Sequence, residues 1–224
     1  MNKKHKPTAG LMECRSYQCE VRAEQDEQNG TYITGHPIVF GQVTELKTWA
    51  GTIREVIDPK AIDAQTDMKD VRFLVGHDDT RIPMARSRNN NKNSTMQLTP
   101  DTIGLGMRAN IDTENNGTAR ELYSAAGRGD ISGMSFRFVA DKDSWEDVDT
   151  DKPLRRILHI ARIIEVSACA FPAYEGTDLE AADESERLES LIASLESERK
   201  RLGEERAEAQ KKERRERALQ TLRR

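Results

Sequence analysis

The chain is poor in cysteine, with only Cys14, Cys19 and Cys169 among its 224 residues. These three lack the paired Cys-x-x-Cys spacing of a zinc site, and an odd number does not make a disulfide framework. Cys169 lies inside the apolar run Ala168–Phe171, which is typical of a buried structural thiol. We therefore expect free thiols, no metal and no other cofactor.

Long hydrophobic runs are also missing. No segment approaches the roughly 20 apolar residues of a membrane span. The polar, basic start of the chain has no apolar signal-peptide core. We expect a soluble protein of cytoplasmic origin that does not bind a membrane.

A strong excess of charge of one sign is absent as well. The chain has 35 Lys and Arg against 39 Asp and Glu, for a net charge of −4. Locally basic stretches at Lys211–Arg215 and Arg223–Arg224 are largely cancelled by acidic neighbours. This balance predicts no specific nucleic-acid partner.

The last quarter of the chain has a composition of its own. From Asp178 to Arg224 there are no aromatic residues and no proline, and Glu, Arg, Lys, Ala and Leu dominate. This composition predicts a long solvated helix. A three-four spacing of Leu188, Leu191, Leu195 and Leu202, with Ile192 beside it, indicates a short coiled-coil seam through which the chain could self-associate. Because the seam decays beyond Leu202, a lone helix is an equally good interpretation.

Most of the preceding residues alternate polar and apolar side chains with the period of a β-strand. The predicted strands cover residues 12–23, 31–40, 52–57, 71–75, 95–98, 103–111, 131–140 and 154–170, with a charged loop at 141–152. Helices are predicted at 116–128 and at 58–67, where Asp58 is a candidate N-cap and Pro59 a first helical residue. Many strands and few helices indicate a mainly β, α+β fold, either a barrel or a sandwich.

Three of these segments carry residues with complementary chemistry. The small-residue turn Gly129–Gly133 leads into Ser135, the strand before Gly76 delivers His77 at its end, and Glu165 interrupts an apolar strand. A serine hydroxyl is a weak nucleophile until an imidazole removes its proton, and the imidazole needs a third group to fix its tautomer. Together the three supply a candidate nucleophile, base and orienting acid.

The same segments resemble the prohead maturation proteases of tailed bacteriophages, serine endopeptidases related in fold to the herpesvirus assemblins. The resemblance covers roughly residues 30 to 177. The matching stretches are Ile38–Phe40, Ile53–Ile57 with Pro59, Gly76–Asp78, Gly129–Phe136, Glu165–Ser167 and Phe171–Tyr174.

The resemblance implies a role for each site residue. Ser135 would be the nucleophile, His77 the general base, and Glu165 would stand where the assemblins carry a second histidine. It also implies an assemblin-like closed or nearly closed β-barrel with a few flanking helices, followed by the long C-terminal helical tail.

The implied function is cleavage of the scaffolding segments of capsid proteins, and of the protease itself, during head maturation. The implied partners are the major capsid protein and its scaffolding segment, and the implied location is the host cytoplasm, inside the viral procapsid. The alternative is a non-enzymatic scaffolding protein that uses the helical tail. The presence of all three site residues favours the enzyme.

Two positions depart from the family pattern. Family members usually have an asparagine before the histidine and a glycine two residues after the serine, where this chain has Gly76 and Arg137. Neither change removes a catalytic group.

Other residues compete for each role. Ser132 is an alternative nucleophile, but three positions along a strand place it on the opposite face from Ser135. Glu165 could pair with Arg162 or with another arginine in place of His77. His159 is a rival third residue, but six positions from Glu165 place it about 20 Å away along a strand. The sequence does not identify the group that would stabilise an oxyanion.

These observations divide the chain into three parts. We expect a disordered N-terminus at residues 1–10, a protease domain at 11–177, and a charged helical or short coiled-coil tail at 178–224.

Overall fold

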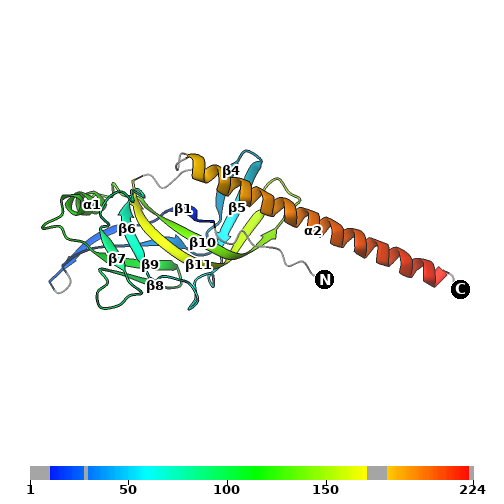
Figure 1. Cartoon of the computed structure of the whole chain (residues 1–224), viewed down its shortest axis with the longest axis horizontal. Coiled ribbons are helices and arrows are strands. Elements are labelled where there is room, and N and C mark those ends of the chain that lie inside the picture. The colour runs from blue at the N-terminus through cyan, green and yellow to red at the C-terminus, as the bar shows by residue number, and fades with distance from the viewer. Residues whose placement is uncertain (1–10, 28–29, 171–180, 222–224) are drawn as a thin grey trace.

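The computed structural model describes residues 11–27, 30–170 and 181–221. The predicted disordered N-terminus and the Phe171–Tyr174 motif lie outside these residues. The described chain forms two β-sheets and two helices, and the long helix α2 projects well beyond the β-structure (Figure 1).

The larger sheet has seven strands, and its main path is β1-β10-β11-β5-β4. The long strand β11 has two parallel neighbours along one edge, with β5 beside its first half and β6 beside its second half. The strands of this sheet are β1 (Glu13–Gln18), β4 (Thr44–Thr48), β5 (Gly51–Ile57), β6 (Val71–Val75), β7 (Ala85–Ser87), β10 (Gly133–Glu146) and β11 (Leu154–Cys169).

The smaller sheet has four strands in the order β2-β3-β9-β8. They are β2 (Arg22–Asp26), β3 (Gly30–Val39), β8 (Met96–Pro100) and β9 (Gly104–Asn110). One hydrophobic core contains side chains from both sheets, including Ile33 of β3 and Phe136 of β10. Among the described residues no hydrogen-bonded ladder joins the two sheets. The predicted closed or nearly closed barrel is therefore wrong as a description of the strand pairing, whereas the mainly β character with a long C-terminal helix is confirmed.

The predicted strand at residues 12–23 is instead two strands in different sheets. β1 pairs with β10, and β2 pairs with β3 as expected for the adjacent segment. Between them the backbone N–H of Cys19 donates to the carbonyl of Ser132. The chain thus leaves one sheet and enters the other within three residues.

The helix predicted from Asp58 to Asp67 does not form, and turns occupy that segment. The carboxylate of Asp58 accepts from the N–H of Lys60, and that of Asp63 accepts from the N–H of Gln65. Such local side-chain to backbone bonds offer the chain an alternative to helical hydrogen bonds.

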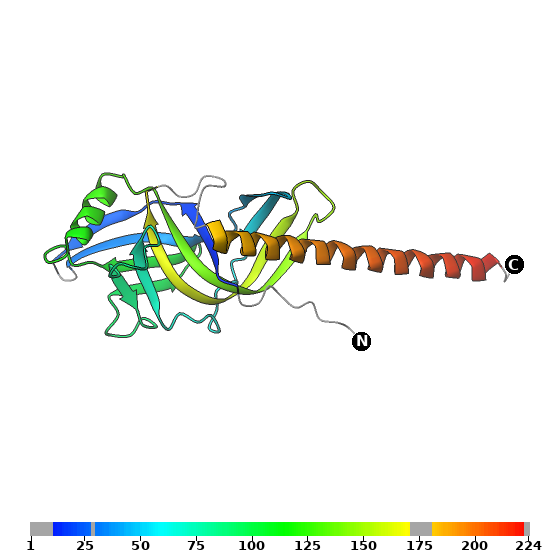
Figure 2. The same ribbon diagram turned by 45° about the horizontal axis from the view of Figure 1, so that its top comes forward.

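The helix predicted at 116–128 does form, as α1 (Gly117–Gly127). The side chain of Asn116 accepts from the N–H groups of Thr118 and Ala119, which caps the first turn. α1 lies at the end of the molecule opposite the projecting tip of α2 (Figure 2).

The leucine seam of the tail packs against the β-structure of the same chain. Helix α2 (Ala181–Thr221) buries Leu191, Ile192 and Leu195. Leu191 and Leu195 belong to a second hydrophobic cluster with Ile53 and Trp145, and Leu202 packs against that cluster. An apolar stripe of this spacing fits a sheet as readily as a second helix, so the pairing of two copies through this seam stays a prediction.

Polar contacts extend the docking of α2 along the helix. The indole N–H of Trp145 donates to the hydroxyl of Ser194 (3.1 Å), and Arg199 donates to the carbonyl of Val148. Farther along, Arg206 pairs with Asp149. Side chains from 207 to 217 are exposed.

Candidate active site

Strand β10 presents Ser135 on the face of the sheet that is turned away from the shared core. Successive side chains of a strand point to opposite faces. Met134 approaches Gly35 of the smaller sheet, and Phe136 stacks on Phe138 in the core. Ser135 therefore points the other way, and its side chain has no exposed surface.

The register of three neighbouring strands gathers polar residues around Ser135. Directly paired residues of an antiparallel ladder point to the same face. Ser135 pairs with Ser167 of β11, and Arg137 pairs with Glu165. On the other side, the same two residues of β10 pair with Ser16 and Cys14 of β1. These six positions form one polar patch on three adjacent strands.

His77 reaches this patch from the end of β6. Gly76 and His77 both have a left-handed backbone, with φ of 61°, a conformation that is uncommon for a residue with a side chain. The backbone N–H of Gly76 donates to the carbonyl of Ala168, and that of His77 donates to the Ser167 hydroxyl (3.1 Å). These two bonds to β11 hold the strained turn in place. A glycine before the histidine, where the resembled family usually has asparagine, suits this backbone.

The three residues singled out from the sequence are in contact with one another. His77 Nε2 lies 2.6 Å from Ser135 Oγ, and His77 Nδ1 is hydrogen-bonded to Glu165 Oε1. The Ser167 hydroxyl donates to the second oxygen of Glu165 (2.8 Å). This chain of contacts runs from a hydroxyl through an imidazole to a carboxylate, and all three groups are buried. Such an order of groups is able to activate a serine for nucleophilic attack.

The protonation of His77 depends on its neighbours. Burial disfavours the charged imidazolium, but hydrogen bonds with Cys14, Cys169 and Glu165 outweigh burial and raise the pKa of His77 to about 11. For the Cys14 thiol, burial works against ionisation, yet the hydrogen bond to His77 leaves its pKa below the ordinary value. The raised pKa favours the imidazolium form of His77 in this arrangement.

Arg137 brings a further positive charge to the carboxylate. Its Nε lies 3.6 Å from Glu165 Oε1, and its guanidinium also approaches Asp79 at 3.8 Å. These distances are longer than a hydrogen bond. Arg137 therefore adds a Coulombic contact to a carboxylate that His77 and Ser167 orient.

The competing residues lie elsewhere. Ser132 precedes β10, and its hydroxyl donates to the carbonyl of Ala170. Arg162 is paired with Asp67. His159 is buried with one nitrogen on Asp141 and the other 3.3 Å from Asp63. The structure thus brings together Ser135, His77 and Glu165 and keeps these alternatives apart from them.

Three contacts of the site escaped the sequence analysis. Ser167 had a signal, because it follows Glu165 by two positions and so shares its face of the strand. Cys14 lies 3.4 Å from Ser135 Oγ and 3.5 Å from His77 Nε2, and the carbonyl of Arg15 accepts from the Ser135 hydroxyl (2.8 Å). Nothing in the local sequence reveals these two, because they depend on β1 pairing with a strand about 120 residues away.

The described part of the chain contains no arrangement of side chains for a metal ion and no helix that could span a membrane. Its three cysteines are free thiols. Within residues 11–27, 30–170 and 181–221, no cluster of three or more His, Cys, Asp or Glu side chains is arranged to hold a metal ion. Neither described helix has the length and apolar character needed to cross a bilayer.

Comparison with solved structures finds a similarity to the capsid assembly protease of bacteriophage T4. The sequence identity is 13%, the TM-score is 0.42, and the similarity covers 71% of this chain and 97% of that one. None of the curated proteins compared with the chain matches it.

The family comparison covers most of the chain and includes the whole site. The profile of the caudovirus prohead serine proteases matches residues 17–190, a span that contains His77, Ser135 and Glu165. We conclude that the chain belongs to the caudovirus prohead serine protease family.

Proposed function

We propose that this phage capsid maturation protease is a serine endopeptidase in which Ser135 is the nucleophile, His77 the general base and Glu165 the orienting acid. The observation that carries the proposal is the contact chain from Ser135 Oγ through His77, at 2.6 Å, to Glu165. Family membership supports the reaction class, and this geometry supports the assignment of roles.

The proposed cycle begins with His77 neutral at Nε2. As Ser135 Oγ attacks the peptide carbonyl, Nε2 takes the hydroxyl proton, and Glu165 stabilises the imidazolium through Nδ1. The imidazolium then gives its proton to the leaving amine, which departs and leaves an acyl-enzyme. Water, deprotonated by the same nitrogen, hydrolyses the ester and restores Ser135.

The proposed substrates are capsid proteins, in particular the scaffolding segment of the major capsid protein, together with the protease itself. The proposed location is the interior of the procapsid in the host cytoplasm. The proposed parts are a protease domain at residues 11–177 and a tail at 178–224.

Co-expression with the cognate major capsid protein tests the activity. Intact mass over time should show truncated capsid protein or self-cleavage with the wild type and neither with Ser135→Ala, since loss of a triad serine costs roughly 10⁶-fold in turnover. Ser132→Ala is the matched control, because it removes a nearby hydroxyl that does not contact His77. Cleavage by both Ser135→Ala and wild type would move the nucleophile elsewhere, whereas cleavage by neither in assembled shells would favour the scaffolding role.

We propose that the free end of α2 contacts the capsid or its scaffold. The support is its division into a docked part, which ends near Arg206, and an exposed, charged part beyond it. A truncation after Arg206 keeps the docked contacts, so it should fold as the full chain does but enter proheads less often. Unchanged incorporation, quantified by mass spectrometry of purified proheads, would contradict the proposal.

A further inference from the structure

The hydroxyl of Ser135 is covered by strand β1. Its side chain has 0% exposed surface, the Sγ of Cys14 lies 3.4 Å from its oxygen, and the carbonyl of Arg15 accepts its proton at 2.8 Å. A peptide carbonyl has to come within van der Waals contact of the attacking oxygen. Part of the structure around Ser135 must therefore move before a peptide reacts.

The hydrogen bonds of Ser135 are also arranged against catalysis. A backbone carbonyl only accepts, so the Ser135 hydroxyl donates its single proton to Arg15 and not to His77. The 2.6 Å contact with His77 Nε2 is then made by a proton on that nitrogen, which agrees with the raised pKa of the imidazole. A base that already holds its proton, beside a hydroxyl that points elsewhere, cannot begin the reaction.

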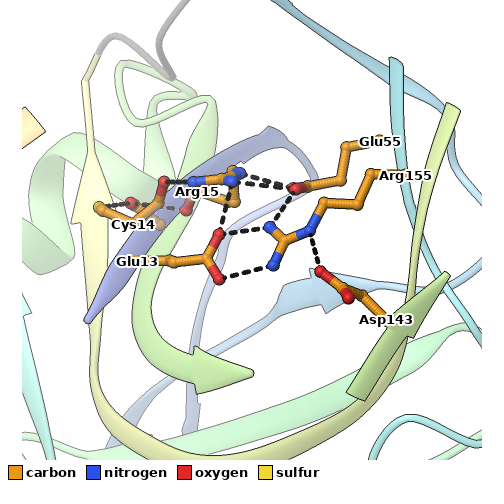
Figure 3. Close-up of polar contacts among 7 residues, drawn as sticks. Glu13, Cys14, Arg15, Glu55, Asp143 and Arg155 are labelled. Atoms are coloured by element: carbon orange, nitrogen blue, oxygen red, sulfur yellow. Dashed lines mark hydrogen bonds and ion pairs between the residues drawn. The ribbon is translucent and has the colours of Figure 1, made fainter. Parts of the chain in front are cut away.

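β1 carries a second set of side chains that hold it in this position. Its even-numbered residues, Cys14 and Ser16, face the site, while Glu13 and Arg15 face the opposite side. There, five buried or nearly buried charged groups from four strands point toward one another (Figure 3). The members are Glu13 and Arg15 of β1, Glu55 of β5, Asp143 of β10 and Arg155 of β11.

Withdrawal of β1 would not change the net charge of the buried network. The network holds three carboxylates and two guanidinium groups, and β1 contributes one of each. When β1 is absent, Arg155, whose side chain is 1% exposed, keeps Glu55 at 2.9 Å and Asp143 at 2.7 Å. The net charge of the network is therefore the same with and without β1, which lowers the cost of withdrawal relative to breaking a buried pair.

The topology is compatible with withdrawal. β1 is the edge strand of its sheet, and the only strand it pairs with among the described residues is β10. The family match begins at residue 17, so Glu13–Ser16, the part of β1 that contacts the site, precedes the matched region. The three residues of the proposed triad are carried by β6, β10 and β11, and these strands pair through β11 without β1.

We propose that β1 is an autoinhibitory strand, which holds the enzyme in an inactive state until it leaves the edge of β10. This inference rests on the proposed role of Ser135 as nucleophile. Withdrawal of Cys14 and of the Arg15 carbonyl uncovers Ser135 and frees its proton to point toward His77.

The test measures how fast a small fluorophosphonate probe modifies Ser135 in the full-length protein. If opening precedes reaction, the rate follows the fraction of molecules with β1 withdrawn. Glu13→Gln weakens two bonds to Arg155 and one to Arg15, so it should raise the labelling rate by roughly tenfold or more. Asp143→Asn is the matched control, because it perturbs Arg155 from β10 and leaves β1 attached.

The outcomes separate the inference from the proposed function. Faster labelling of Glu13→Gln but not of Asp143→Asn supports the autoinhibitory strand. Equal or slower labelling of a folded Glu13→Gln protein overturns it while leaving Ser135 as nucleophile. Labelling of Ser135→Ala at the wild-type rate would instead remove the proposed nucleophile.

Hydrogen exchange of the wild-type protein provides a second test that needs no variant. Amides of residues 13–18 should exchange faster than those of residues 134–140, because β1 opens without global unfolding. Modification of Ser135 by the probe should remove the remaining protection of residues 13–18. Protection of β1 as strong as that of β10, before and after modification, would overturn the inference.

Discussion

The structure contains two buried histidines that are each paired through Nδ1 with a carboxylate, and only one of them adjoins a hydroxyl. His77 has Glu165 on one nitrogen and Ser135 on the other, whereas His159 has Asp141 on one and Asp63 on the other. Both side chains are less than one-tenth exposed. A buried histidine–carboxylate pair is therefore not a site by itself. The group on the second nitrogen distinguishes an imidazole that adjoins a hydroxyl from one that links strand β10, which carries Asp141, to the turn segment that carries Asp63.

Substitution of each histidine should give the largest difference in kcat between the His77–Glu165 pair and the His159–Asp141 pair. His77→Gln should reduce kcat for capsid-protein cleavage by roughly 10⁶-fold, since a triad histidine costs as much as the serine it serves. His159→Gln should leave kcat within a few-fold of wild type and lower the melting temperature, because it breaks buried contacts away from the triad. Cleavage assays measure kcat and thermal unfolding measures the melting temperature of both variants. Equal losses of kcat in two folded proteins would contradict the assignment of a catalytic role to His77 and a structural role to His159.

The two carboxylates provide the next largest contrast. Glu165→Gln keeps the shape of the side chain but removes the charge that stabilises the imidazolium, so kcat should fall by roughly 10⁴-fold. Asp141→Asn makes the matching change at His159 and should leave kcat unchanged. Single-turnover cleavage of a capsid-derived peptide reports both. A fully active Glu165→Gln enzyme would show that another group orients His77.

Substitution of Ser167 should give the smallest change in kcat of these predictions. The Ser167 hydroxyl accepts from the backbone N–H of His77 and donates to Glu165. Ser167→Ala removes both hydrogen bonds, and at about 1 kcal/mol for each bond kcat should fall by roughly 5- to 30-fold. KM should be unaffected, because Ser167 lies behind the triad and not beside the substrate. Ser132→Ala serves again as the control, and a change confined to KM would argue for a different role of Ser167.

Local pattern predicted much of the fold, and tertiary context decided the rest. Alternation at period two identified the hairpin of β8 and β9, and a short apolar run identified β6, which ends two residues before His77. The helix predicted at 116–128 forms as α1, and Asn116 caps it. The segment after Asp58 carries the residues of a helix start, yet its carboxylates bond to nearby N–H groups and form turns. The closure of sheets and the surface that receives the leucine seam of α2 are properties of the assembled chain that no local pattern encodes.

The candidate site shows the same division. Ser135, His77 and Glu165 could be selected because each combines a reactive side chain with the end or the middle of an apolar strand, and because they match a family. Arg155 and Asp143 could not be selected in this way. Asp143 lies in a predicted charged loop and Arg155 in a predicted strand, and a charged side chain is expected to be solvated unless its buried partner is known. Cys14 and the Arg15 carbonyl were missed because they come to the site through pairing with β10 alone.

The position of β11 in the sheet sets an order of events during synthesis. β11 is the last strand of the sheet to leave the ribosome, and it is also the strand that joins β10 to β5 and β6. It carries Glu165 and Ser167, so a nascent chain shorter than about 170 residues has the serine and the histidine but nothing to bring them together. At elongation rates of roughly 5–20 residues per second, the proposed centre of Ser135, His77 and Glu165 is therefore incomplete for most of the time that the chain takes to be synthesised.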